Sequence, residues 1–171
     1  MELMLVIAVL LILAAVTFPS IAAMQGNVRQ KAATDTVRAR IADGRARAME
    51  HGAEYRLAVH QDGTRLRLAA DGPDFADRPA DNPPTGSSLA SEDTLEKATV
   101  AVLADASMGE TPADSSGWVT IATFLPDGTC REDSVVIAIN EPTFPAMRVH
   151  LRGVTGSSRV LPPDTTVRGK L

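Results

Sequence analysis

The sequence predicts an α+β fold, with a long N-terminal helix packed on a C-terminal antiparallel β-sheet domain. Three patterns predict it. An unbroken apolar run occupies Leu3 to Val16, a stripe of small apolar residues then recurs every three or four positions, and after Gly52 apolar and polar residues alternate. The first two patterns are typical of a helix and the third of strands with one buried face. The 171 residues leave room for one domain of ordinary size beyond the helix.

The first 24 residues are long and apolar enough to predict a transmembrane helix. As a helix, Leu3 to Met24 would reach roughly 33 Å, which matches the hydrocarbon core of a bilayer. Glu2 stands at the edge of this run, where a charge needs a partner or an interfacial position. Pro19 cannot donate a backbone hydrogen bond, so it is expected to bend the helix.

Residues 25–52 predict a continuation of this helix outside the membrane. Val37, Ile41, Gly44 and Ala48 share one narrow face, and arginines lie mainly off it. Gly52 is a plausible C-cap, which places the helix end near His51. A stripe of small residues suits a helix laid closely against a sheet.

Residues 53–171 predict the antiparallel β domain. Alternation in 54–60 and 65–68 around Asp62-Gly63 indicates a hairpin with one buried face. Further strands are predicted at 98–103, 118–124, 134–139, 147–151 and 159–161. Pro126-Asp127-Gly128 supplies a turn between two of them.

An acidic, proline-rich segment at 71–96 interrupts the strand pattern. It holds seven acids, four prolines and one arginine, so we expect a long exposed loop. The acids at 71, 74, 77 and 81 raise the alternative of a calcium site. Their spacing fits no EF-hand and Arg78 opposes a cation, which favours a solvated loop.

The spacing of the acid and the proline carries a resemblance. Glu2 and Pro19 lie seventeen residues apart around an apolar helix, as in the type IV pilin superfamily, which this chain resembles. The resemblance implies that Glu2 neutralises the methylated terminal amine of a neighbouring subunit during assembly. It also implies that other pseudopilins or pilins are partners through the helix. An ion pair in apolar surroundings adds little net stability, but it fixes how one helix aligns with its neighbour.

Two later motifs indicate a branch of that superfamily. "FLPDGTC" and "MRVHLRGVTGSSRV" resemble the turn and late hairpin of GspH/FimT-type minor pseudopilins. The resemblance implies a minor pseudopilin, a structural subunit of a type II secretion pseudopilus. It implies a single-pass protein of the bacterial inner membrane with its C-terminal domain in the periplasm.

Members of the superfamily carry a short basic leader ending in glycine before the helix. We expect such a leader upstream of Met1, cut by a prepilin peptidase. A secretory signal peptide cut near Ser20-Ile21-Ala22 and an ordinary membrane anchor are the alternatives. With an ordinary membrane anchor, the chain would be an unrelated single-pass β domain.

The sequence predicts no enzyme, metal or cofactor. His51, His60 and His150 lack metal-ligand spacing, and Cys130 has no partner base indicated by any motif. The chain contains no G-x-S-x-G, Walker A or G-x-G-x-x-G pattern.

A basic C-terminal region raises a binding function as the alternative. FimT-like minor type IV pilins contact DNA, and a cluster of basic residues would suit phosphates. The candidate residues are Arg148, Arg152, Arg159, Arg168 and Lys170. Asp164 and Glu141 dilute this charge and no aromatic residues are interleaved, so the pattern favours scattered surface charge over a DNA site.

Overall fold

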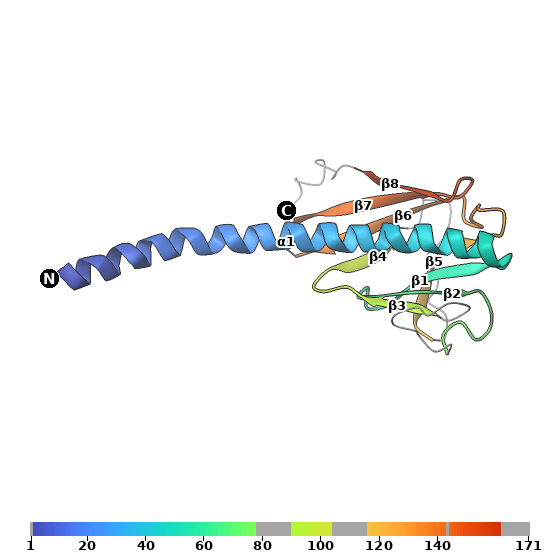
Figure 1. The fold of residues 1–171 in the computed structure, drawn as a ribbon, viewed down its shortest axis with the longest axis horizontal. Coiled ribbons are helices and arrows are strands. Elements are labelled where there is room, and N and C mark those ends of the chain that lie inside the picture. The colour runs from blue at the N-terminus through green and yellow to red at the C-terminus, as the bar shows by residue number, and fades with distance from the viewer. Residues whose placement is uncertain (1, 78–89, 104–115, 143, 162–171) are drawn as a thin grey trace.

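A computed structural model describes residues 2–77, 90–103, 116–142 and 144–161. It contains one long helix, α1 (Glu2–His51), followed by strands in two sheets. The strands are β1 (Tyr55–His60), β2 (Arg65–Ala70), β3 (Ser91–Thr94), β4 (Thr99–Leu103), β5 (Trp118–Phe124), β6 (Ser134–Glu141), β7 (Phe144–Arg152) and β8 (Ser157–Leu161). The predicted α+β fold is confirmed, with the C-terminal half of α1 lying along the sheets (Figure 1).

Helix α1 runs without interruption through Pro19 and ends at His51. The next residue, Gly52, has a φ of 63°, the left-handed conformation that closes helices and that glycine adopts without steric cost. The predicted stripe is buried: Val37 and Ala48 have no exposed surface and Ile41 has 1%. The predicted continuation of the helix to residue 51 is therefore confirmed.

The strands of the predicted antiparallel β domain divide into two four-stranded sheets. The first has the order β3-β2-β1-β5 and the second the order β4-β6-β7-β8. Every pair is antiparallel, and the hairpin of β1 and β2 aligns Leu57 with Leu68. In Figure 1 β7 and β8 lie above α1, and β1, β2 and β3 lie below it. Strand alternation predicts which residues share a face, but it does not predict which strands pair.

The main core lies where the two sheets meet the helix. It joins apolar residues of the helix stripe to the inner faces of both sheets, including Leu57, Leu68, Ile137 and Leu151. Gly44 allows the closest approach: a Cβ at this position would lie 2.7 Å from the ring of Phe124. The small-residue stripe thus permits the close packing that the sequence predicts.

A second apolar cluster covers the other face of the first sheet. Phe75 and Trp118 meet edge to face at 6.5 Å between ring centroids, and both are buried. They pack on Ala58 and Ala69, which point away from the main core. The expectation of a hairpin with one buried face is therefore wrong, because the segment after β2 folds back and covers the second face.

The segment 71–96 also differs from the predicted exposed loop. Residues 91–94 form β3, which pairs with β2 and aligns Arg67 with Glu92. The side chain of Arg67 is buried and forms an ion pair with Glu92 at 2.9 Å. Residues 78–89, including Arg78 and position 81, lie outside the described residues. The polar sequence of β3 gave no alternating signal, so a cross-strand ion pair rather than apolar alternation fixes this strand.

Candidate assembly and binding surfaces

The first turns of α1 expose every apolar side chain that the structure describes there. This part of the helix extends beyond the sheet domain, as the blue part of Figure 1 shows. Each side chain described between residues 2 and 25 is exposed, from 48% for Ile7 to 81% for Met4. These side chains are Met4, Val6, Ile7, Val9, Leu10, Ile12 and Leu13, which we call the exposed apolar segment. Apolar surface of this extent on a helix marks a site of contact with another apolar body.

The two predicted assembly residues lie on this part of the helix. The backbones of Glu2 and Pro19 are helical, and their side chains lie outside the described set. Their roles therefore stay predictions. Within the portion of the chain that the structure describes, no helix meets the length and apolarity needed to cross a bilayer.

A polar junction marks the point where α1 leaves the sheet domain. The side-chain amide of Gln30 is buried and donates hydrogen bonds to the carbonyls of Ile139 (3.2 Å) and Pro145 (2.8 Å). One turn earlier, a Cβ on Gly26 would lie 2.7 Å from the ring of Phe144. No sequence pattern singled out Gly26 or Gln30, because their partners come from strands more than a hundred residues away.

An ion pair fastens the C-terminal half of α1 to the first sheet. Arg40 pairs with Asp93 of β3, with Nη2 donating to Oδ1 at 2.8 Å, and also with Asp43. The hydrogen bond to Asp93 is the main reason that the pKa of Arg40 is raised above its ordinary value. Asp43 also pairs with Arg47 at 2.9 Å. The Arg40–Asp93 contact therefore links the helix to β3, whereas the contacts of Asp43 run along the helix.

Three of the five predicted basic residues share one face of the second sheet. Arg148 and Arg152 alternate along β7, and Arg159 of β8 lies opposite His150, between them. Directly opposed residues in an antiparallel pair point to the same face. This face is opposite to Val149 and Leu151, which are buried in the main core. Arg168 and Lys170 lie outside the described residues.

Cys130 is not activated as a nucleophile. Cys130 is 8% exposed, and burial together with the charge of Glu132 raises the pKa of its thiol to about 11. A thiol of this kind is almost entirely protonated at neutral pH and is a poor nucleophile. Ser134 and His150 share a hydrogen bond of 2.7 Å on the outer face of the second sheet. Among the described side chains, no cluster of His, Cys, Asp and Glu is arranged to hold a metal.

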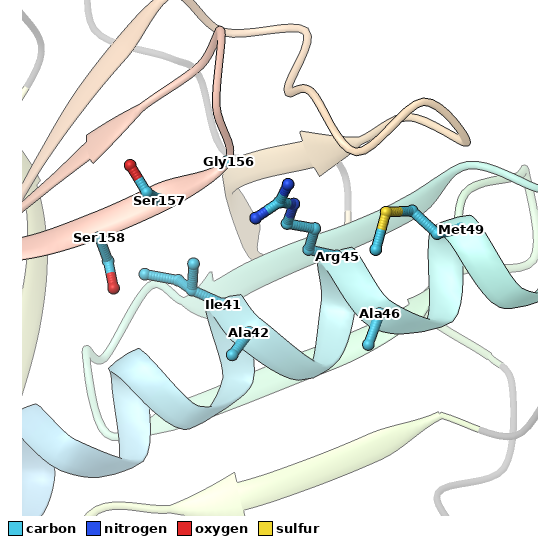
Figure 2. Close-up of a pocket in the computed structure, with 8 residues that line it drawn as sticks. All are labelled: Ile41, Ala42, Arg45, Ala46, Met49, Gly156, Ser157 and Ser158. Carbon is cyan, nitrogen blue, oxygen red and sulfur yellow. The ribbon is translucent and has the colours of Figure 1, made fainter.

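A groove runs between α1 and β8, with a volume of about 270 Å³. It is lined by Ile41, Ala42, Arg45, Ala46, Met49, Gly156, Ser157 and Ser158 (Figure 2). In the sequence, Arg45 is one of several arginines that lie off the apolar stripe of the helix. Its position against the β7–β8 turn depends on tertiary packing, which helical spacing alone does not reveal.

Comparison with solved structures finds the same fold in pilin-like proteins. Two structures of the minor pseudopilin EpsH from the type 2 secretion system of Vibrio cholerae are similar, with TM-scores of 0.53 and 0.56. Their identities to this chain are 18% and 16%. The alignments cover 79% and 81% of this chain, and 98% and 96% of theirs. The type IV minor pilin FimU of Pseudomonas aeruginosa matches with a TM-score of 0.50 at 14% identity, over 78% of this chain and 93% of its own.

No family model and no curated protein matches the sequence. The likeness therefore lies in the fold. This chain has the type IV pilin-like fold of the GspH type, as the two sequence motifs predicted.

Proposed function

We propose that this chain is a minor pseudopilin, a structural subunit that joins the pseudopilus of a type II secretion system through its N-terminal helix. One observation carries the proposal: the exposed apolar segment continues a helix whose other half is firmly packed on the sheets. A rigid helix of this kind presents an apolar surface that neighbouring helices would cover. The role is structural and needs no catalytic group.

In this proposal the chain is an inner-membrane protein before it joins the pseudopilus. The apolar run Leu3–Val16 would lie in the bilayer as a single pass, with the sheet domain in the periplasm. Other pseudopilins or pilins would then replace lipid around the helix. Glu2 would neutralise the terminal amine of a neighbour and so fix the register of the new subunit.

Replacement of Glu2 by alanine tests the assembly mechanism. Glu2→Ala should leave the thermal unfolding of the sheet domain unchanged, because residue 2 lies on the half of α1 outside the core. It should reduce recovery of the subunit in sheared pseudopili at least tenfold. Glu50→Ala is the matched control, since Glu50 is an exposed acid at the other end of the same helix. Equal recovery of Glu2→Ala and wild type would remove this role for Glu2.

Mass spectrometry of the N-terminus from native membranes tests processing by a prepilin peptidase. The expected result is an N-methylated residue a few positions upstream of Met1. An unmodified Met1 would instead support an unrelated single-pass anchor, and a start near Ala23 would indicate a secreted protein. Both of those results contradict the pseudopilus proposal.

DNA binding by a FimT-like minor pilin is the second candidate function. The observation that favours it is the common face of Arg148, Arg152 and Arg159. Full-length protein in detergent should then bind duplex DNA with an affinity that falls steeply with salt. Changing all three arginines to glutamine should weaken binding to every DNA sequence. It should also reduce the slope of log K against the logarithm of the salt concentration by roughly three. Arg38→Gln, on the exposed side of α1, is the control, and absence of binding at low salt rejects this candidate.

A further inference from the structure

The groove between α1 and β8 is bounded on one side by the edge of a sheet. β8 is the last strand of its sheet, and no described strand pairs with its outer edge. Met49, which is 49% exposed, supplies apolar surface on the helix side, beside Ala42 and Ala46 (Figure 2). Ser157 and Ser158 lie on the strand side. The groove therefore combines apolar side chains with a strand edge.

Arg45 is the charged residue of this groove, and it lacks the partner that its neighbours have. Three other arginines on this half of α1 form ion pairs with described carboxylates: Arg38 with Asp35 at 3.9 Å, Arg40 with Asp43 at 3.2 Å and Arg47 with Asp43 at 2.9 Å. No described carboxylate pairs with Arg45. Its Nε is buried without a hydrogen-bond partner. Arg45 therefore brings to the groove a positive charge that no described carboxylate neutralises, and a carboxylate that enters the groove would pair with it.

Two glycine turns hold the Arg45 side chain in place. A Cβ on Gly128 would lie 3.2 Å from its Nε, and a Cβ on Gly156 would lie 3.0 Å from its Cδ. Both glycines also have positive φ values, 82° and 59°, which other residues rarely adopt. The turns that precede β6 and β8 thus pack around the stem of the arginine. Its guanidinium points from α1 toward the turn at Gly156, just before β8 (Figure 2).

We propose that this groove binds an extended peptide segment of a partner protein that carries one Asp or Glu side chain. The segment adds to the free edge of β8 through backbone hydrogen bonds, and its carboxylate pairs with Arg45. Edge-strand addition gives affinity through the main chain, and side-chain pockets give specificity. Arginine suits a carboxylate because its planar fork donates two parallel hydrogen bonds. Charge complementarity therefore selects an acidic partner.

This site is separate from the exposed apolar segment. It lies on the packed half of α1, so its occupation requires no filament and no membrane. A partner bound here would face the side of the domain, whereas the N-terminal helix would contact other helices. The failure of one proposal leaves the other intact.

Peptide binding to the full-length chain in detergent micelles tests the inference. The probe is the fluorescent pentapeptide acetyl-Thr-Val-Glu-Val-Thr-amide, with a glutamine version as the neutral match. We expect the glutamate peptide to bind at least tenfold more tightly. Arg45→Gln should abolish this difference, and Arg38→Gln, a nearby exposed arginine, should preserve it. Equal binding of the two peptides to wild type, or no binding of either, would overturn the proposal.

A second variant tests whether the peptide occupies the groove, without changing the charge of Arg45. Ala46→Trp adds a large side chain at an exposed groove position, so it should block both peptides while the thermal unfolding midpoint stays unchanged. Glu2→Ala should bind the peptides as wild type does. Acetate that competes as strongly as the glutamate peptide would show a simple anion site and would also overturn the peptide proposal.

Discussion

At the scale of single residues, Gly44 explains how close the helix comes to the sheet. A Cβ at this position would lie 2.7 Å from the Phe124 ring and 2.9 Å from a methyl group of Leu68. Both neighbours are fully buried, so they have little room to move. The absence of a side chain at residue 44 therefore sets the distance between α1 and the first sheet.

Gly44→Leu should destabilise the domain by about 1–3 kcal/mol, because overpacking a close contact outweighs the gain in helix propensity. Urea unfolding followed by circular dichroism measures the change. Ala39→Leu, on the exposed side of the same helix, should stay within about 0.5 kcal/mol of wild type. A Gly44→Leu protein as stable as Ala39→Leu would show that the helix moves freely on the sheet.

Cys130 offers a second prediction at the residue scale. Burial raises the pKa of its thiol from 9.0 to about 11, so the native thiolate fraction at pH 8 should be roughly 100-fold below that of the unfolded chain. Alkylation by iodoacetamide should therefore be at least that much slower in the native protein. Its rate should keep rising with pH beyond 9, where that of urea-unfolded protein levels off. Equal native and unfolded rates at pH 8 would contradict the burial of this thiol.

At the scale of elements, local sequence patterns predicted most helix and strand positions. They failed where contacts between distant residues determine whether a strand forms. The helix end at His51 followed from Gly52, and alternation located β1, β2 and most later strands. β3 was missed because its sequence, Ser-Glu-Asp-Thr, contains no apolar residue. Pairing of Arg67 with Glu92 stabilises it instead, and that contact depends on chain reversal between β2 and β3.

The candidate sites were predictable to different extents for the same reason. Alternation in "MRVHLR" already places Arg148 and Arg152 on one face, and the hairpin register then adds Arg159. The groove around Arg45 was not predictable. It requires knowing that the turns at Gly128 and Gly156 meet on the helix, although they lie far from it in sequence.

The junction at Gln30 gives a prediction for the helix as an element. Gln30→Leu would leave the carbonyls of Ile139 and Pro145 without their donor, which should cost about 1–3 kcal/mol. Hydrogen exchange of the amides of residues 28–36 should speed up more than that of residues 40–48, because the junction opens first. Lys31→Leu, an exposed neighbour, should change neither quantity. Uniform acceleration along the helix would mean that the junction has no local role.

At the scale of the whole molecule, α1 joins two different environments. One half is the central element of a folded domain, and the other exposes apolar side chains from Met4 to Leu13. A monomer in water would leave this surface uncovered, at a cost of about 25 cal/mol per Å² of apolar area. Removal of the apolar surface should therefore change where the protein partitions and leave the stability of the sheet domain unaltered.

Leu10→Glu tests this separation, since Leu10 is 59% exposed on the exposed apolar segment. A carboxylate in the middle of a membrane-embedded helix costs about 2.5–3.5 kcal/mol, so partition into a detergent phase should fall on the order of 100-fold. Leu10→Phe keeps the surface apolar and should partition as wild type does. The urea midpoint of the sheet domain should be the same in all three proteins, because residue 10 lies outside both apolar clusters. A Leu10→Glu protein that partitions as wild type does would show that this half of the helix does not enter an apolar phase.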